Sequence, residues 1–364
     1  MIGKSVRPAP KSPDFHVPGV SCPAEECLLR ARRMTLLGVM KRLILPVAFA
    51  ALLSRAKAEP VAEQVTWREL PAFCLTDGRS EAIVVPSLGG RVVHFGLTGG
   101  INWMWTGEPG TEKKMPALYW GGDKTCLGPH SLWSLAQEAM WPPPAPDFQP
   151  CEVVAPRGLF STLSAPWPGS GARIRRDYSF GKDGELVIAH SIAPVPGSRE
   201  MAALWVIAQT IPTDSVFVPL ATQSPYKDGY FRFGFEKPAG SWATLLSPTL
   251  LQLKPEPGVG FKLGAHPKLP ALATVKDGLA FLQRADPQDG MYPEGADGAG
   301  LSVEVYHHDL KGSGEYTELE QLSPLRQLDK GIALTTRWSI HAISETSPES
   351  KIREIVRLLS SAEK

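Results

Sequence analysis

The feature that most constrains the fold is a succession of short apolar, β-branched or aromatic runs separated by Gly, Pro and Asp. The 364 residues include 34 Gly and 35 Pro. Both residue types interrupt regular structure, and runs of this length fit strands, so the pattern predicts an all-β sandwich. Leu186, Ile188 and Ile192 share one parity, which predicts a strand with one buried face. The runs lie at 82–85, 91–96, 101–105, 172–180, 185–192, 202–211, 215–220, 230–235, 279–284, 301–308, 315–321 and 332–340.

Two segments carry helix signals. Residues 131–140 can form about two turns after Pro129. At the C-terminus, Ser347 can cap a helix and Pro348 fits its first turn. This helix has one apolar stripe, made of Ile352, Ile355, Val356 and Leu359. We expect the stripe to pack on the sandwich, which divides the chain into a continuous β domain at 59–345 and a helix at 346–364.

The N-terminal region predicts export. Met40-Lys-Arg is followed by the apolar run 43–53 and by Ala56-Lys-Ala58. A short basic head, an apolar centre too short to span a membrane and an A-x-A ending are typical of a signal peptide at 40–58. Residues 1–39 lack a periodic apolar pattern, and we expect them to be a disordered upstream extension. The mature protein is therefore predicted to be secreted or periplasmic, with no membrane span.

Charge excludes two classes of partner. Residues 1–58 hold ten of the 38 Lys and Arg but only three of the 37 Asp and Glu, so the remaining chain is mildly acidic. Nucleic acids and anionic membranes require concentrated Lys and Arg, and we expect neither as a partner. We expect no cofactor, because Gly89-Gly90 lacks the Lys-Ser/Thr ending and the helix of a phosphate loop. His307-His308-Asp309 lacks further ligands, so no metal is expected.

Three cysteines follow residue 58, too few for a disulfide scaffold or a zinc site. In an oxidising compartment one bridge can form, and Cys126 with Cys151 is the pair that the sequence favours. Cys74 is then expected to be a buried thiol.

Residues 120–144 resemble a binding surface more than an ordinary loop. Asp123 and Lys124 can hydrogen-bond hydroxyl groups, and Trp133 and Trp141 offer flat apolar faces on which a sugar ring can stack. Arg91, directly after two glycines, is expected at a strand edge beside a cleft, where its guanidinium can hold sugar hydroxyls. The alternatives are that the tryptophans close the end of a sandwich and that Asp123, Lys124 and Arg91 are ordinary structural or solvated residues.

Near the C-terminus, alternation in 314–324 predicts a strand with Tyr316, Glu318 and Glu320 on one face. Thr317, Leu319 and Gln321 lie on the other face. Two carboxyl groups and a phenol on one face can serve acid–base chemistry if that face lines a cleft. They are a solvated edge if it faces water.

Taken in order, several of these segments resemble the DUF4380 group. They are Gly-Gly-Arg-Val-Val-His-Phe at 89–95, Trp-Gly-Gly-Asp-Lys at 120–124, Trp-Pro-Pro-Pro at 141–144, Ala-Leu-Trp-Val-Ile-Ala-Gln at 203–209 and 316–331. That group is similar to the galactose mutarotase (aldose 1-epimerase) superfamily, and the resemblance covers about residues 82–340. It implies a large two-layered β-supersandwich.

The resemblance also implies roles for residues. In mutarotases a late carboxylate takes the anomeric proton and a histidine protonates the ring oxygen. Glu318 matches the carboxylate, and Glu320 beside it is expected to contact substrate. The Asn-His-x-Tyr-Phe segment has no counterpart here, since the middle strand carries Trp205 and Gln209, which we expect to bind substrate. His130 is the candidate that can replace the missing acid.

These observations predict a carbohydrate-binding protein of the mutarotase-like superfamily, which can act as an aldose 1-epimerase on an anomeric centre. The alternative is a non-catalytic module that recognises a glycan or another protein. A glycan lyase or hydrolase is a third reading, although hydrolysis requires two carboxyl groups at a set separation across a cleft.

Overall fold

The computed structural model describes residues 59–107, 120–130, 145–234, 242–255, 258–295, 300–310, 314–343 and 348–360. These residues belong to one compact unit, Ala56–Lys364. The predicted extension at 1–39, the predicted signal peptide at 40–58 and the predicted helix at 131–140 lie outside them.

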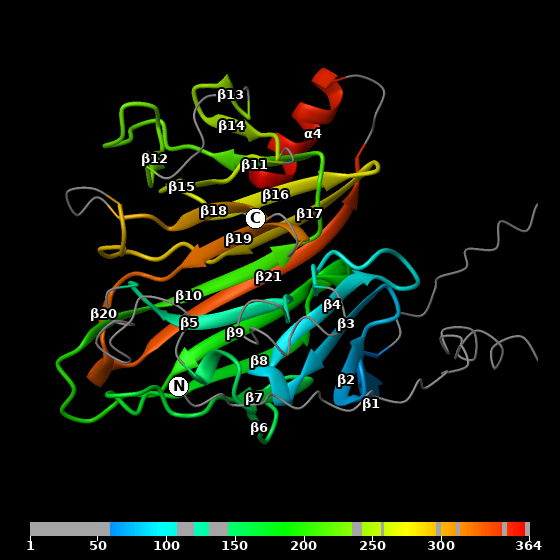
Figure 1. Cartoon of the computed structure of the whole chain (residues 1–364), viewed down its shortest axis with the longest axis vertical. Helices are drawn as coiled ribbons and strands as arrows, with labels where there is room; N and C mark the ends of the chain where they lie inside the picture. The colour runs from blue at the N-terminus through cyan, green and yellow to red at the C-terminus, as the bar shows by residue number, and fades with distance from the viewer. Residues whose placement is uncertain are drawn as a thin grey trace, which may run out of the picture. The chain divides into compact units, whose positions relative to one another are not determined.

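Within the described residues the strands form three sheets in which every neighbouring pair is antiparallel (Figure 1). The first sheet has four strands, β1 (Val61–Trp67), β2 (Leu70–Thr76), β3 (Ser80–Val85) and β4 (Arg91–Leu97), in that order. The second has seven: β12 (Phe231–Arg232), β15 (Phe261–Ala265), β18 (Val303–Leu310), β19 (Gly314–Leu322), β10 (Met201–Thr210) and β20 (Arg326–Gln327), with β5 (Asp123–Gly128) paired to β10. The third has ten: β13 (Ala243–Ser247), β14 (Leu250–Leu253), β11 (Ser215–Pro219), β16 (Ala271–Lys276), β17 (Leu279–Ala285), β21 (Ile332–Ala342), β9 (Leu186–Ile192), β8 (Ile174–Phe180), β7 (Phe160–Leu163) and β6 (Glu152–Val153).

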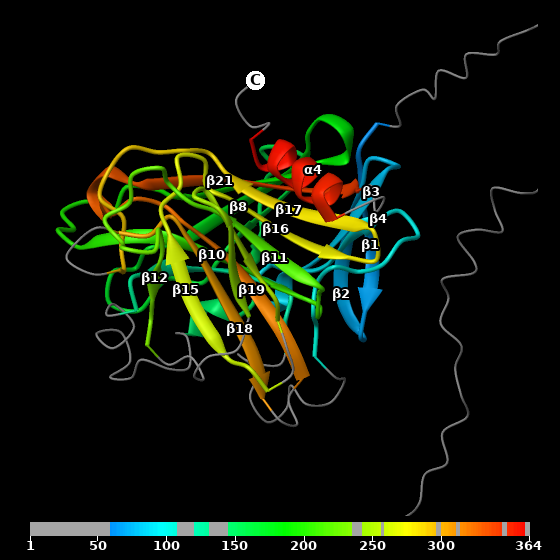
Figure 2. The same ribbon diagram turned by 90° about the horizontal axis from the view of Figure 1, so that it is seen from above.

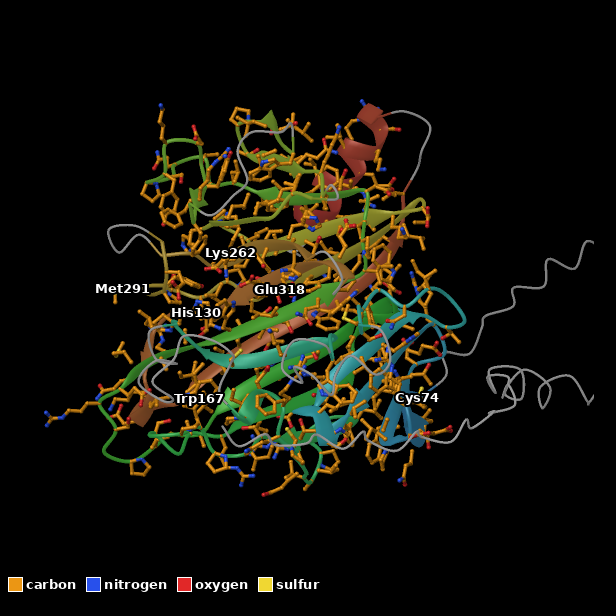
Figure 3. All side chains as sticks on the ribbon, in the orientation of Figure 1. Cys74, His130, Trp167, Lys262, Met291 and Glu318 are labelled. Atoms are coloured by element: carbon orange, nitrogen blue, oxygen red, sulfur yellow. The ribbon has the colours of Figure 1, made fainter. Side chains whose placement is uncertain are left out.

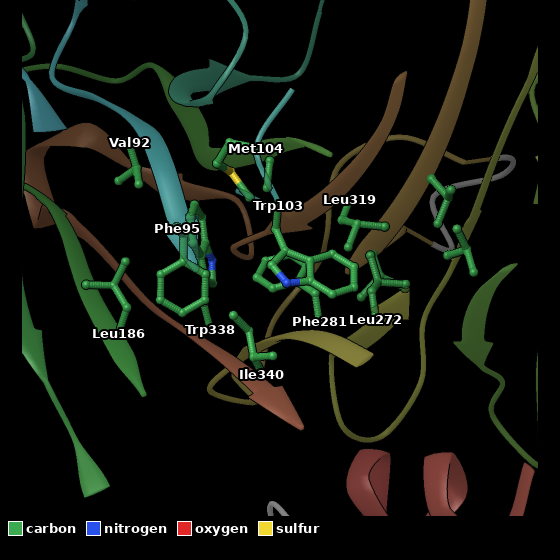
Figure 4. Packing of buried hydrophobic residues seen from close by; sticks show 14 of the residues in the cluster. Val92, Phe95, Trp103, Met104, Leu186, Leu272, Phe281, Leu319, Trp338 and Ile340 are labelled. Atoms are coloured by element: carbon green, nitrogen blue, oxygen red, sulfur yellow. The ribbon is translucent and has the colours of Figure 1, made fainter. Parts of the chain in front are cut away.

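The seven- and ten-stranded sheets pack face to face around a shared core (Figure 2). Phe95, Trp103, Phe281 and Trp338 form the aromatic centre of this core (Figure 4). The rings of Trp103 and Phe281 stack with centroids 5.8 Å apart, and the edge of Trp338 meets Phe281 at 5.7 Å. Leu319 of β19 packs into the same core from the other sheet. The core therefore takes only one face of the seven-stranded sheet.

Period-two alternation decides which side chains enter the core. In β9, Leu186, Ile188 and Ile192 are buried, and Val187, Ala189 and Ser191 of the other parity are half-buried, as the sequence predicts. His190 has the same parity and is also buried, where its ring contacts the hydroxyls of Thr125 and Thr336. A polar side chain is tolerated in the interior because it finds hydrogen-bond partners there.

The C-terminal helix α4 (Pro348–Ser360) covers the outer face of the ten-stranded sheet (Figure 2). Ile355, Leu358 and Leu359 are buried against strands β16 and β17, and Ile352 is partly buried. Val356, which we predicted in the buried stripe, is instead 41% exposed. Leu358 takes its place, because it shares the helix face of Ile355 and Leu359 that is turned toward the sheet.

The predicted all-β fold with a C-terminal helix is confirmed. The prediction of a strand at 101–105 is wrong, because only Met104 pairs there, in an isolated bridge to Thr210. The predicted runs omit strands β1, β2, β5, β6, β7, β13, β14, β15, β16 and β20. No helix within the described ranges combines the length and apolar character that crossing a bilayer requires.

Candidate functional site

The candidate site lies on the face of the seven-stranded sheet opposite the core. Leu319 points into the core, so Glu318 and Glu320, on either side of it, share the other face, as the alternation predicts. On the neighbouring strand β18, Tyr306 pairs with Glu318 and Glu304 pairs with Glu320. We call this face of the sheet the polar face. Its side chains are Glu304, Tyr306, Glu318 and Glu320, together with Lys124 on β5, Gln209 on β10 and Lys262 on β15. Figure 3 shows Glu318, Lys262 and His130 gathered over it.

Glu318 is held in place by side chains of strands β10 and β5. Gln209, its register partner on β10, donates a hydrogen bond from Nε2 to Glu318 Oε1 over 2.8 Å. The Nζ of Lys124 on β5 lies 3.8 Å from the same oxygen. Burial raises the pKa of Glu318, Lys124 opposes this rise and Glu320 adds to it. Glu318 is thus a buried carboxyl group in a fixed position, and 8% of the residue remains exposed.

Glu320 lies in a second, deeper cluster. Trp205 donates its indole N–H to Glu320 Oε2 over 2.6 Å, and Lys262 Nζ donates to the same oxygen over 3.1 Å. Lys262 also pairs with Glu304 Oε2 at 2.6 Å. Burial raises the pKa of Glu320 to about 7, against the opposing effect of Lys262. Burial alone would lower the pKa of Lys262, but Glu304 and Glu320 outweigh it and raise that pKa.

His130 lies at the edge of the polar face but is poorly suited to act as the acid. Its ring meets the ring of Trp205 edge-on, with centroids 4.8 Å apart, and its backbone N–H bonds the Glu294 carboxyl over 3.1 Å. Burial and the nearby Lys262 and Lys124 lower the pKa of His130 to about 4. The imidazole is therefore neutral near pH 7, which removes the physical basis for our prediction that it donates the missing proton.

Trp205 and Gln209, predicted to bind substrate, are both interior residues. Trp205 is 2% exposed, and the ammonium of Lys262 lies 4.6 Å from the centre of its ring. Lys262 therefore covers the face of the Trp205 ring, and the indole N–H of Trp205 is hydrogen-bonded to Glu320. Within the part of the chain that the structure describes, Gln209 Oε1 has no hydrogen-bond partner. That oxygen sits beside Glu318, where it can accept a ligand hydroxyl.

The expectation that Arg91 lies open beside a cleft is wrong. Arg91 has no exposed surface, and its guanidinium donates to the carbonyl of Gly121 and the carboxylate of Asp147, both over 2.8 Å. Asp123, also expected to bind substrate, accepts the Val92 N–H over 2.6 Å and pairs with the buried Arg176. Both side chains form interior ion pairs, so their contacts are structural.

Asp123 and Lys124 separate because they are consecutive residues of strand β5. Successive strand side chains point to opposite faces. Asp123 pairs in register with Ala208 of the core, whereas Lys124 pairs with Ile207 and reaches Glu318. Only the lysine of this pair therefore belongs to the polar face.

The glycines before Asp123 have a structural explanation. Gly121 has φ +62°, and a Cβ there would lie 2.1 Å from the carbonyl oxygen of Trp105. Trp120 lies next to Trp67, with ring centroids 6.2 Å apart, in a cluster with strands β2–β4. Trp133 and Trp141, the two predicted stacking residues, lie outside the described residues.

The predicted disulfide is not formed, because Cys126 and Cys151 are both free thiols. Cys126 is fully buried, whereas Cys74 is only partly buried and so differs from the buried thiol that we expected. Among the described residues, no group of three or more His, Cys, Asp or Glu side chains is placed to hold a metal ion.

Sequence reasoning missed Glu304, Tyr306 and Lys262. A signal for the first two exists, because Val303, Glu304, Val305 and Tyr306 alternate, and β18 pairs with β19, the next strand along the chain. Lys262 had no such signal. It reaches Glu304 and Glu320 only because β15 pairs with β18, a contact between segments far apart in the chain.

Comparison with known proteins gives similarity at the level of structure alone. No family model matches the chain, and no curated protein does. The Slr1438 protein from Synechocystis sp. PCC 6803 is 12% identical with a TM-score of 0.50, over 79% of this chain and 97% of that one, which shows a shared fold. A putative aldose 1-epimerase from Escherichia coli K12 is 9% identical with a TM-score of 0.49, over 78% and 100%. A galactose mutarotase related enzyme from Lactobacillus acidophilus is 6% identical with a TM-score of 0.43, over 77% and 97%.

Proposed function

We propose that the protein binds a carbohydrate on the polar face and interconverts its anomers, with Glu318 as the base. The observation that supports this most is the setting of Glu318, a buried carboxyl group fixed by Gln209 and partly neutralised by Lys124. The proposal also includes membership of the DUF4380 group, on the sequence resemblance described above.

The chemistry requires a carboxylate that can take the proton of an anomeric hydroxyl. Burial raises the pKa of Glu318, so its carboxylate is a stronger base than one in water. Lys124, whose Nζ lies 3.8 Å from the Glu318 carboxyl, opposes this rise in pKa by favouring the charged form. The Gln209 amide fixes the direction of the carboxylate and presents its own oxygen to a neighbouring hydroxyl.

A second candidate function is a glycan-binding module without catalysis. The low pKa of His130 favours it, because the residue expected to replace the mutarotase acid is neutral at pH 7. On this alternative the polar face holds a sugar by hydrogen bonds alone.

The test is polarimetry of freshly dissolved α-D-glucose and α-D-galactose with the full chain, with sugar binding followed by calorimetry. Glu318→Gln keeps shape and hydrogen bonding but removes the base, so the rate should fall about 10²- to 10⁴-fold while sugar affinity is mostly kept. Glu315→Gln is the matched control. It lies on the same strand but on the opposite face, where its carboxyl is 3.8 Å from His307, and its rate should match wild type.

The outcomes separate the two functions. Wild-type protein that binds either sugar without accelerating its mutarotation would establish the non-catalytic module. Equal rates for wild type and Glu318→Gln would exclude Glu318 as the base.

A further inference from the structure

An open cavity of about 630 Å³ lies between β12 and the hairpin of β13 and β14. Strands β12 and β13 stand first in the strand orders of the seven- and ten-stranded sheets, and both lie at the same end of the molecule (Figure 1). Arg232 lines the cavity from one sheet, and Ala243 and Leu245 line it from the other, whereas no side chain of the polar face does. Its volume falls within the range of small-molecule sites, about 300–1,000 Å³.

Arg232 is held in this cavity by aromatic rings. Its guanidinium donates to the Tyr230 hydroxyl over 2.7 Å and lies 5.3 Å from the ring centroids of both Tyr230 and Trp242. Trp242 is 2% exposed and belongs to the sandwich core, and Tyr230 packs against that core. The arginine is therefore anchored to rigid parts of the fold, although the residue itself is exposed.

The charge of Arg232 is not matched by the protein. Over the ranges that the structure describes, Arg232 forms no ion pair, and its one hydrogen bond goes to a neutral phenol. A guanidinium carries more N–H donors than this bond uses. Arg91, Arg176 and Arg284, in contrast, each pair with a carboxylate. Arg232 thus combines a fixed position with donors that remain available to a ligand.

The other polar side chains of the cavity suit a hydroxylated anion. Lys227 is exposed there and, like Arg232, has no ion pair with any described residue. Asp228 supplies the carboxyl group among the described lining residues, so two cations against one carboxylate leave a net positive charge. Thr222 and Ser224 add hydroxyls that can donate to or accept from the hydroxyls of a ligand.

We propose that this cavity binds a small polyhydroxylated anion, a sugar acid or a sugar phosphate, with its oxyanion on Arg232. A guanidinium holds carboxylate or phosphate oxygens in pairs, and Lys227 adds a point charge beside it. Because core rings already hold Arg232, less side-chain freedom is lost on binding than at an ordinary surface arginine. Asp228, Thr222 and Ser224 then meet the ring hydroxyls. This site lies apart from the polar face, so the inference does not rest on the proposed function.

The experiment is calorimetric titration of the full chain with D-glucuronate, D-glucose 6-phosphate, D-glucose and sodium sulfate. At least one of the two anionic sugars should bind about tenfold or more tightly than sulfate, which has an oxyanion but no ring hydroxyls. Comparison of the two shows whether the site takes a carboxylate or a phosphate. Binding of the anionic sugar should weaken as the salt concentration rises from about 0.02 M to about 0.15 M, because the attraction is electrostatic.

Variants connect the binding to the cavity. Arg232→Gln should weaken binding of the anionic sugar about ten- to a hundredfold and leave that of D-glucose unchanged. Arg232→Lys keeps the charge but lacks the planar fork, so its affinity should lie between the two. Lys227→Gln should weaken binding by a smaller factor, and it supplies a measurement that does not depend on the folding of the Arg232 variants. Lys330→Gln is the matched control, because Lys330 is 74% exposed and does not line the cavity.

The competing role of Arg232 is to cover Trp242 without binding a ligand. In that case Arg232→Gln would lower the Tm but leave anion binding unchanged. The assignment is overturned if neither anionic sugar binds at millimolar concentration, if sulfate binds as tightly as both, or if Arg232→Gln and Lys227→Gln keep wild-type affinity. Loss of anionic-sugar binding in Glu318→Gln but not in Arg232→Gln would also overturn it, by placing that ligand on the polar face. Mutarotation of neutral sugars is a separate readout, so failure of this site leaves the proposed function intact.

Discussion

Charged residues near the candidate site fall into two groups according to which way the strand directs them. Lys124, Lys262, Glu318 and Glu320 gather on the polar face, where burial raises the pKa values of the two carboxyl groups and the neighbouring lysines oppose that rise. Arg91 is directed into the interior and is matched there by Asp147. Residue type alone does not distinguish these groups, since both contain cations paired with carboxylates.

The role assigned to Arg91 can be tested by removing its side chain. Arg91→Ala leaves the Asp147 carboxylate buried without its partner, which should cost about 3–5 kcal/mol of unfolding free energy. Urea denaturation followed by tryptophan fluorescence measures this. Lys330→Ala is the control, because Lys330 is 74% exposed beside Asp329 and its removal should cost less than about 1 kcal/mol. Weaker sugar binding with unchanged stability in Arg91→Ala would restore Arg91 to the binding site.

At the scale of the element, β19 shows how one strand serves two functions. Leu319 fills the sandwich core while Glu318 and Glu320 face away from it. Gln321, on the core side, donates to the carbonyl of Gln283 in the opposing sheet. The position of the two carboxyl groups is thus fixed by the packing of their neighbours, and this rigidity suits residues that must hold a substrate.

Helix α4 offers a test of element packing on two consecutive residues. Ile355 is fully buried against the ten-stranded sheet, whereas Val356 is 41% exposed. Ile355→Ala should therefore cost about 2–5 kcal/mol of unfolding free energy, and Val356→Ala should change it by no more than about 0.5 kcal/mol. Thermal and urea unfolding of the two variants measures both changes in unfolding free energy. Equal losses would mean that the helix does not pack through this face.

For the molecule as a whole, buried histidines should make stability depend on pH. The pKa values of His130 and His190 are lowered, both mainly by burial, that of His130 to about 4. Between about pH 6.5 and pH 4 the unfolded chain takes up protons that the folded chain does not, so unfolding becomes easier as the pH falls. The raised pKa of Glu320 acts in the opposite direction, because the folded state holds that proton between about pH 4.5 and 7.

These opposing effects are separated by comparing variants with wild type. His190→Gln keeps a polar side chain between Thr125 and Thr336 but cannot titrate. The stability difference between wild type and His190→Gln, measured by urea unfolding at several pH values, should shift toward the variant as the pH falls below 6.5. A constant difference across this range would show that His190 titrates alike in the folded and unfolded chains.

The sequence alone determined the β architecture, the C-terminal helix and the face shared by Glu318 and Glu320. Each depends on local periodicity, which the order of residues records directly. The alternation around Leu319 was sufficient to place two carboxyl groups together, and the apolar stripe was sufficient to place α4 on the sheet apart from the exchange of Val356 for Leu358.

Tertiary structure decided what those carboxyl groups contact. Lys262 reaches Glu320 through the pairing of β15 with β18, and Lys124 reaches Glu318 through that of β5 with β10. Arg91 was placed wrongly for the same reason, since its partner Asp147 lies 56 residues away. Such pairings depend on which strands become neighbours, a property of the whole fold that no local window of sequence contains. The pKa shifts follow from the same pairings, because burial and nearby charge exist only after the sheets assemble.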